Sequence, residues 1–194
     1  MTKMEPLTLI LVRHAEAVAP KDGDGAESER DRPLTGRGIR DAETLAETLR
    51  AMKPDAIFSS PYRRAIQTVE PIARQHELPI ELIEDLRERL LFPLALTDWK
   101  DHLQRSWRDF DYALPRGESS NLAQARVLAS IEKIRSGRHS GVIVAASHGN
   151  LISLALHAYA PKIDFDFWAA MPSPAVYRLE YRDARWHVVE GPGI

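Results

Sequence analysis

Apolar and polar positions change along this chain in blocks that predict strands and helices in turn. Short aliphatic runs bounded by polar residues are typical of buried parallel strands. Such runs lie over residues 9–12, from residue 55, over 78–86 and over 141–146, while 175–181 and 186–189 predict a terminal hairpin. Helical patterns separate the strands, so we expect an α/β fold of three layers, with helices on both faces of a central, mostly parallel sheet.

The helices are indicated by the spacing of apolar residues and by capping residues. Thr35 is suited to cap a helix whose apolar stripe consists of Ile39, Ala42, Leu45, Ala46, Leu49 and Met52. A second helix is expected to begin near Pro61, which suits the first helical position, with Pro71 kinking or shortening it. Further helices are expected around 99–107, after the polar residues 117–121, and over 151–159, where nearly every residue is apolar.

Two segments lack a regular pattern. Residues 20–32 are polar and contain glycine, so we expect a solvated surface loop in preference to a mobile edge of a site. Residues 90–116 are irregular and rich in aromatic side chains. They are expected to form a small flap, which either closes over an apolar substrate tail or is a packed subdomain.

Length and composition limit the class of protein. The 194 residues fit one domain, 1–194, with the flap at about 90–116. The net charge of −2 does not indicate a nucleic-acid surface, and the absence of cysteine excludes disulfides and thiolate metal sites. The opening residues do not form a signal peptide and no apolar segment has the length of a membrane span, so we expect a cytoplasmic protein without a membrane partner. A homodimer is compatible with these properties.

Three of the predicted strands end in residues suited to phosphate chemistry. Arg13 and His14 follow the first strand, Arg63 and Arg64 follow the strand from residue 55, and His148 follows the last parallel strand. Because ligands bind beyond the carboxyl ends of such strands, we expect these side chains to converge. Arginine offers a planar set of donors for phosphate, and neutral histidine is a nucleophile. The pattern predicts an anion pocket that contains a nucleophile.

Six short segments carry a more specific signal because of their order. They are Arg13-His14-Ala15, Leu34 to Gly38, Ser60 to Thr68, Leu86-Arg87-Glu88, Gly117-Glu118-Ser119 and Ser147 to Asn150. Together they resemble the motifs of the histidine phosphatase superfamily, also called the phosphoglycerate mutase-like family. The third segment selects Arg64 over Arg63, and no motif covers the flap.

The resemblance implies a phosphatase with a phosphoglycerate mutase-like fold that uses no metal and no cofactor. His14 would attack phosphorus and carry the phosphate as phosphohistidine. Arg13, Arg64 and His148 would hold the phosphate oxygens and stabilise the charge of the transition state. The expected partner is therefore a phosphorylated small-molecule substrate.

The resemblance also supplies a general acid and shows two departures. Glu88 would protonate the leaving oxygen and later activate water, with Glu84 and Asp85 as nearby competitors. Ala15 stands where the family usually has glycine, which alters the backbone freedom beside the nucleophile. The asparagine that the family often places shortly after its first motif is missing from 17–20, so we expect backbone amides to replace it.

The sequence leaves the reaction open within the family. We favour hydrolysis of small phosphate monoesters. The alternative is a phosphohistidine-protein phosphatase, because 13–17 and 31–35 resemble the short bacterial enzymes of that kind, although these generally lack the segments at Glu88 and Gly117. A non-catalytic module that binds a phosphorylated ligand is disfavoured because no site residue is missing. A phosphoglycerate mutase is disfavoured because the flap is short and lacks the paired arginines of those enzymes.

Overall fold

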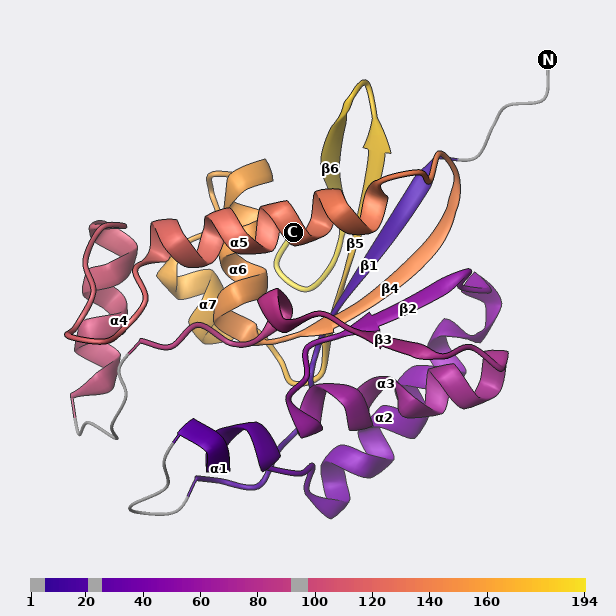
Figure 1. The fold of residues 1–194 in the computed structure, drawn as a ribbon, viewed down its shortest axis with the longest axis horizontal. Helices are drawn as coiled ribbons and strands as arrows, with labels where there is room; N and C mark the ends of the chain where they lie inside the picture. The colour runs from indigo at the N-terminus through magenta and orange to yellow at the C-terminus, as the bar shows by residue number, and fades with distance from the viewer. Residues whose placement is uncertain (1–5, 21–25, 92–97) are drawn as a thin grey trace.

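One mixed sheet organises the molecule. The computed structural model describes residues 6–20, 26–91 and 98–194 (Figure 1). Within these ranges the strand order is β3-β2-β4-β1-β5-β6. The strands are β1 (Leu7–Arg13), β2 (Ala56–Ser59), β3 (Ile80–Leu82), β4 (Gly141–Ser147), β5 (Ala175–Arg182) and β6 (Arg185–Glu190). The four strands β1, β2, β3 and β4 run parallel to one another. β5 is antiparallel to β1 on one side and to β6 on the other. The predicted mostly parallel sheet is therefore confirmed, with an antiparallel hairpin added at one edge.

Helices cover both faces of the sheet, as Figure 1 shows. They are α1 (Ala26–Asp31), α2 (Gly36–Leu49), α3 (Arg63–His76), α4 (Trp99–Arg108), α5 (Ser120–Arg135), α6 (Gly149–Tyr159) and α7 (Phe165–Ala170), with short 3₁₀ helices η1 (Arg50–Met52) and η2 (Glu84–Leu86). α2 and α3 pack on one face, and α5 and α6 pack on the other. None of the helices in the described ranges combines the length and the apolar character needed to cross a bilayer.

β1 fixes the centre of this arrangement because both of its faces are buried. Leu9 and Leu11 pack in the cluster that contains α5 and α6, whereas Ile10 and Val12 pack in the cluster that contains α2 and α3. Side chains of a strand alternate between its faces, so an uninterrupted aliphatic run is what a strand with helices on both sides requires. The end of β1 is consequently held rigidly.

Several predicted helix features are confirmed. The Thr35 side chain accepts a hydrogen bond from the backbone of Gly38 at the start of α2, and the Ser119 side chain caps α5 in the same way. α6 is buried along most of its length, as its apolar composition predicts. The helix expected around 99–107 is α4, and the terminal hairpin is β5 with β6.

Four predictions about elements were wrong. Within the strand predicted over 78–86, only Ile80–Leu82 pairs with β2, because the chain then turns into η2. Ile39 of the predicted apolar stripe is 50% exposed. α3 begins at Arg63, two residues after Pro61, and Pro71 does not shorten it, since the helix continues to His76. Pro71 is itself buried.

The segment 20–32 is not simply a loop. Its last residues form α1, and residues 21–25 lie outside the described ranges. The segment 90–116, predicted to be a flap, is only partly described, since residues 92–97, with Phe92, lie outside the described ranges. Trp107 and Phe110 pack against His157, and Tyr112 stacks on His102. These three aromatic side chains of the flap are therefore used in packing.

Candidate active site

The carboxyl ends of β1, β2 and β4 meet at one edge of the sheet. β1 and β4 are in register, with Arg13 opposite Ser147, and the backbone N–H of His14 donates to the Ser147 carbonyl at 3.1 Å. The N–H of Ser60, just after β2, donates to the Ala146 carbonyl at 2.9 Å. These backbone hydrogen bonds bring the carboxyl ends of β1, β2 and β4 together.

His14 presents one defined nitrogen. Its Nδ1 lies 2.7 Å from the carbonyl oxygen of Ala15. A carbonyl only accepts, so Nδ1 carries the proton and Nε2 carries the lone pair in the neutral ring. Burial, and next the positive charge of Arg64, lower the pKa of His14 from 6.5 to about 3. The imidazole is therefore neutral near pH 7, as a nucleophile must be.

Arg64 is the arginine that faces the nucleophile. Its Nε lies 3.1 Å from Nε2 of His14, and the side chain is 2% exposed. Arg63, the other candidate, is exposed. Thr68 ties this helix to the first motif, because its hydroxyl accepts from the N–H of Ala15 at 3.0 Å and donates to the Arg64 carbonyl at 2.7 Å. Burial lowers the pKa of Arg64, and the charge of Glu29 opposes that shift.

Arg13 is anchored on one side only. Its Nη1 donates to the carbonyls of Met171 and Pro172, whereas its Nε has no hydrogen-bond partner among the described residues. The guanidinium lies against Gly149, where a Cβ would come within 3.0 Å of Nε. Burial lowers the pKa of Arg13, and the charge of Glu88 opposes that shift. Arg13 thus keeps a donor for a bound anion.

His148 is fully buried beside the nucleophile, with 5.2 Å between the two ring centroids. Its Nε2 lies 2.8 Å from the Ser60 hydroxyl oxygen. That oxygen accepts a hydrogen bond from the N–H of Tyr62 at 3.2 Å, and the hydroxyl can donate its own hydrogen to Nε2. Burial, and next Arg64, place the pKa of His148 well below 6.5. In a neutral ring that accepts the Ser60 O–H at Nε2, the proton is on Nδ1. Nδ1 has no partner within the described ranges.

Glu88 is held at the first turn of α6. Its carboxylate accepts three backbone N–H groups, from Arg89 at 2.9 Å, Asn150 at 3.1 Å and Leu151 at 3.0 Å. Asn150 follows Gly149, against which the Arg13 guanidinium lies, so Glu88 lies beside the pocket.

The two competing carboxylates are engaged elsewhere. Glu84 pairs with Arg30 at 2.9 Å, Asp85 pairs with Arg87 at 3.2 Å, and both acidic side chains are 55% exposed. The structure therefore brings all five predicted side chains together, namely Arg13, His14, Arg64, Glu88 and His148.

Two departures from the family pattern, Ala15 and the asparagine missing from 17–20, can be compared with the hydrogen bonds of the neighbouring backbone. Ala15 is fully buried, and its N–H is bonded to Thr68. The N–H of Val18 donates to the Pro33 carbonyl at 2.9 Å. These two backbone amides are therefore already bonded within the protein, and neither fills the place of the missing asparagine.

Sequence reasoning missed residues that support the site. Ser60 and Thr68 lie inside the third motif, so their position was a usable signal. Ser173, whose hydroxyl donates to the His14 carbonyl at 2.7 Å, is 159 residues away in the chain and gave none. Glu29 and Arg32 lie in the segment expected to be a surface loop.

Among the described residues, no group of three or more histidine, aspartate or glutamate side chains is placed to hold a metal ion.

Comparison with known proteins agrees with this geometry. The family model for the histidine phosphatase superfamily (branch 1) matches residues 9–191. The adenosylcobalamin/alpha-ribazole phosphatase of Escherichia coli is 25% identical over 192 residues, covering 95% of this chain and 90% of its own length. The putative phosphoserine phosphatase 2 of Hydrogenobacter thermophilus is 30% identical over 152 residues, 74% of each chain.

Solved structures give the same result for the fold. YhfR of Bacillus stearothermophilus has a TM-score of 0.74 at 26% identity, covering 94% of this chain and 95% of its own. A mycobacterial glucosyl-3-phosphoglycerate phosphatase has a TM-score of 0.76 at 24% identity, covering 94% and 96%. Because the family model spans every strand that carries the site, this chain belongs to the histidine phosphatase superfamily.

Proposed function

We propose that this protein hydrolyses phosphate monoesters of small molecules through a phosphohistidine at His14. One observation carries the proposal: the neutral ring of His14 directs its Nε2 lone pair at the Nε–H of buried Arg64, 3.1 Å away. A phosphate oxygen that takes this N–H places phosphorus next to the lone pair. A nucleophile and its cation are thus ready for phosphoryl transfer.

The reaction follows in two displacements. Nε2 forms a bond to phosphorus while the ester P–O bond breaks, and Glu88 gives a proton to the leaving oxygen. Water then attacks phosphorus, its proton passes to Glu88, and the N–P bond breaks to release inorganic phosphate. Arg13, Arg64 and the Nδ1–H of His148 supply donors for the phosphate oxygens, whose charge they stabilise.

Two observations favour a small oxygen ester over a phosphohistidine protein. Relatives are named as phosphatases of phosphoserine and of alpha-ribazole or adenosylcobalamin compounds, which are small molecules. Glu88 is fixed beside the pocket by three backbone donors. An alkoxide is a poor leaving group and needs a general acid, whereas an imidazole needs one much less.

Trapping of the intermediate tests the proposal. Wild-type protein quenched during turnover of p-nitrophenyl phosphate is expected to carry acid-labile, base-stable phosphate on a peptide containing His14. His14→Ala should abolish both turnover and labelling, while His139→Ala, a change at an exposed histidine, serves as the control. Near-wild-type turnover in His14→Ala would rule out the nucleophile. A screen of phosphorylated metabolites and of a phosphohistidine protein then identifies the substrate class.

A further inference from the structure

A carboxylate outside the six motifs contacts the phosphate-binding arginine. The carboxylate of Glu29, in α1, forms an ion pair with Nη2 of Arg64 at 2.9 Å. The backbone carbonyl of Glu29 accepts a hydrogen bond from Nη1 of Arg64 at 2.8 Å. One residue thus holds both terminal nitrogens of the guanidinium.

The direction of this contact is informative. A guanidinium is planar, with Nε at one end and the two Nη atoms at the other. Because Glu29 holds the Nη end, the Nε end points at His14 Nε2, where the phosphate is to bind. Rotation of Arg64 about its terminal bonds would break the hydrogen bond and the ion pair at once. The contact therefore selects one orientation of the planar group.

Burial distinguishes this pair from an ordinary surface ion pair. The Arg64 side chain is 2% exposed and that of Glu29 is 35% exposed. Exposed pairs contribute little, but a buried cation without a counter-ion is costly. Glu29 is the first of the charges that raise the pKa of Arg64 against its burial. It is thus the main neutralising partner of this arginine.

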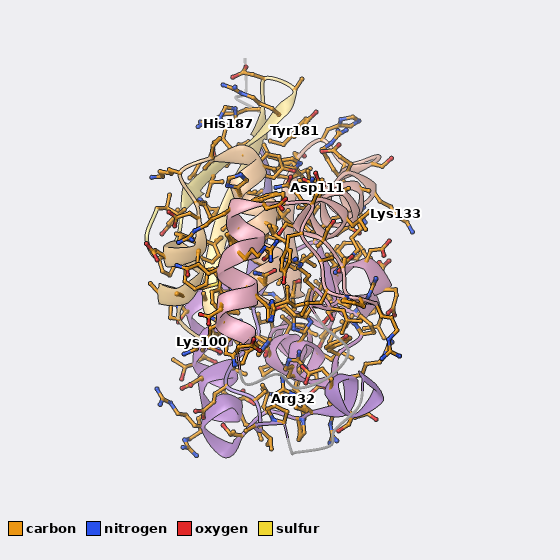
Figure 2. All side chains as sticks on the ribbon, turned by 90° about the vertical axis from the view of Figure 1, so that its left-hand side faces the viewer. Arg32, Lys100, Asp111, Lys133, Tyr181 and His187 are labelled. Carbon is orange, nitrogen blue, oxygen red and sulfur yellow. The ribbon has the colours of Figure 1, made fainter. Side chains whose placement is uncertain are left out.

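α1 is itself fixed on both sides of Glu29. Arg30 forms two hydrogen bonds with Glu84, at 2.9 and 3.0 Å, which tie α1 to η2. Arg32 donates to the Glu29 carboxylate at 2.7 Å and to the Val18 carbonyl at 2.8 Å, which tie it to the loop after β1. Figure 2 places Arg32 at the end of the molecule opposite to the hairpin residue His187. Hydrogen bonds therefore run from the Val18 loop through Arg32 and Glu29 to Arg64.

We infer that Glu29 is a positioning residue for phosphoryl transfer, which holds the Nε end of Arg64 toward the nucleophile and its phosphate. This inference rests on the proposed function and adds to it a residue that touches neither substrate nor the reacting atoms.

Glu29→Gln tests the inference because glutamine keeps the shape and removes the charge. Contacts with a charged partner exceed those with a neutral one by an amount worth about 10-fold in binding. We expect inorganic phosphate, followed by calorimetry, to bind more weakly by about that factor. We also expect kcat for p-nitrophenyl phosphate to fall. Tm should fall as well, because buried Arg64 loses its counter-ion, so binding and kcat are measured well below Tm. Glu43→Gln is the matched control, since Glu43 pairs with Arg74 at 2.8 Å on the exposed surface.

A second background separates positioning from a general loss of structure. Lysine cannot be held at two terminal nitrogens, so in Arg64→Lys protein the further change Glu29→Gln should alter phosphate affinity by less than about twofold. The full loss in that background would overturn the inference, as would a Glu29→Gln protein that binds phosphate as tightly as wild type or more tightly. Wild-type protein that neither binds phosphate nor hydrolyses esters would instead refute the proposed function, and the inference with it.

Discussion

The two neutral histidines of the site differ in the surroundings of their Nε2 atoms, and this difference supports His14 as the proposed nucleophile. Nε2 of His148 is occupied by the Ser60 hydroxyl, 2.8 Å away. Nε2 of His14 faces an arginine N–H that a phosphate oxygen can take instead. Both rings are neutral for the same reasons, burial first and the charge of Arg64 next. These surroundings support the proposed roles, with His14 as the nucleophile and His148 as a donor to phosphate.

The lowered pKa of His14 predicts that its ring stays neutral in mild acid. The folded value of about 3 lies below the ordinary 6.5, so lowering the pH from about 8 to about 5 should not protonate it. Nitrogen NMR of the free protein should show the neutral ring with its proton on Nδ1 across this range, with His14→Gln protein assigning the signal. A titration midpoint between about 6 and 7 would contradict the geometry.

Glu88→Gln should slow the enzyme in proportion to how poor the leaving group is. The amide gives no proton, so the first step with an alkyl phosphate should slow by roughly 10²–10⁴-fold. With p-nitrophenyl phosphate the loss should be much smaller, because nitrophenolate departs without a proton. Burst kinetics must be used, since Glu88 also activates water in the second step.

The burst experiment has two informative contrary outcomes. Equal losses for alkyl and nitrophenyl esters would remove Glu88 from the role of acid. A wild-type preference for a phosphohistidine protein over every ester, by orders of magnitude, would instead favour the alternative substrate class.

Among the helices, the approach of α2 to the end of β1 explains one motif. A Cβ on Gly38 would overlap the backbone carbonyl of Glu16, whereas a Cβ on Gly36 would have no atom nearer than 3.8 Å. Thr35 accepts from Gly38 and also donates to Glu16, at 2.7 Å. The second motif is thus a contact between a helix start and the loop that follows the nucleophile.

Gly38→Ala should therefore destabilise the protein, while Gly36→Ala should not. Overpacking against backbone costs about 1–3 kcal/mol, and for a chain of this length Tm falls by about 2–4 °C for each kcal/mol. Thermal unfolding of the two variants measures the difference directly, because both residues lie in the first turn of the same helix. Equal Tm values would show that the loop after β1 moves to accommodate a methyl group.

The elements that the sequence predicted well are those buried on both sides. β1, β4 and α6 are covered by other elements on both sides and consist of nearly continuous apolar residues. Such runs predict both the element and its burial. β3 lies at an edge of the sheet and pairs over only three residues, so hydrophobic pattern says little about its length. α1 is polar, and its place depends on the ion pairs of Glu29 with Arg64 and of Arg30 with Glu84. These partners are distant in the sequence, so no local pattern encodes the contacts.

Across the whole molecule, the sequence predicted which side chains lie at the strand ends, but not the distant residues that hold those side chains by hydrogen bonds. His14, Arg64 and His148 follow strands, and parallel strands end at one edge. The carbonyls of Met171 and Pro172 that hold Arg13, and the hydroxyl of Ser173 on His14, come from the segment between α7 and β5. Their contact with β1 depends on the antiparallel pairing of β5. Only the complete sheet shows that contact.

The assembled site also predicts that activity persists in a chelator. Charge on the transferring phosphoryl group must be neutralised, either by metal ions or by side chains. Here Arg13 and Arg64 approach it from two strand ends, and no histidine or carboxylate cluster suited to a metal occurs among residues 6–20, 26–91 and 98–194. Turnover after dialysis against EDTA should equal that before, within about twofold. Turnover that is lost in EDTA and restored by a divalent ion would mean that the arginines alone do not carry the charge, and Arg13→Ala and Arg64→Ala should then retain metal-dependent activity.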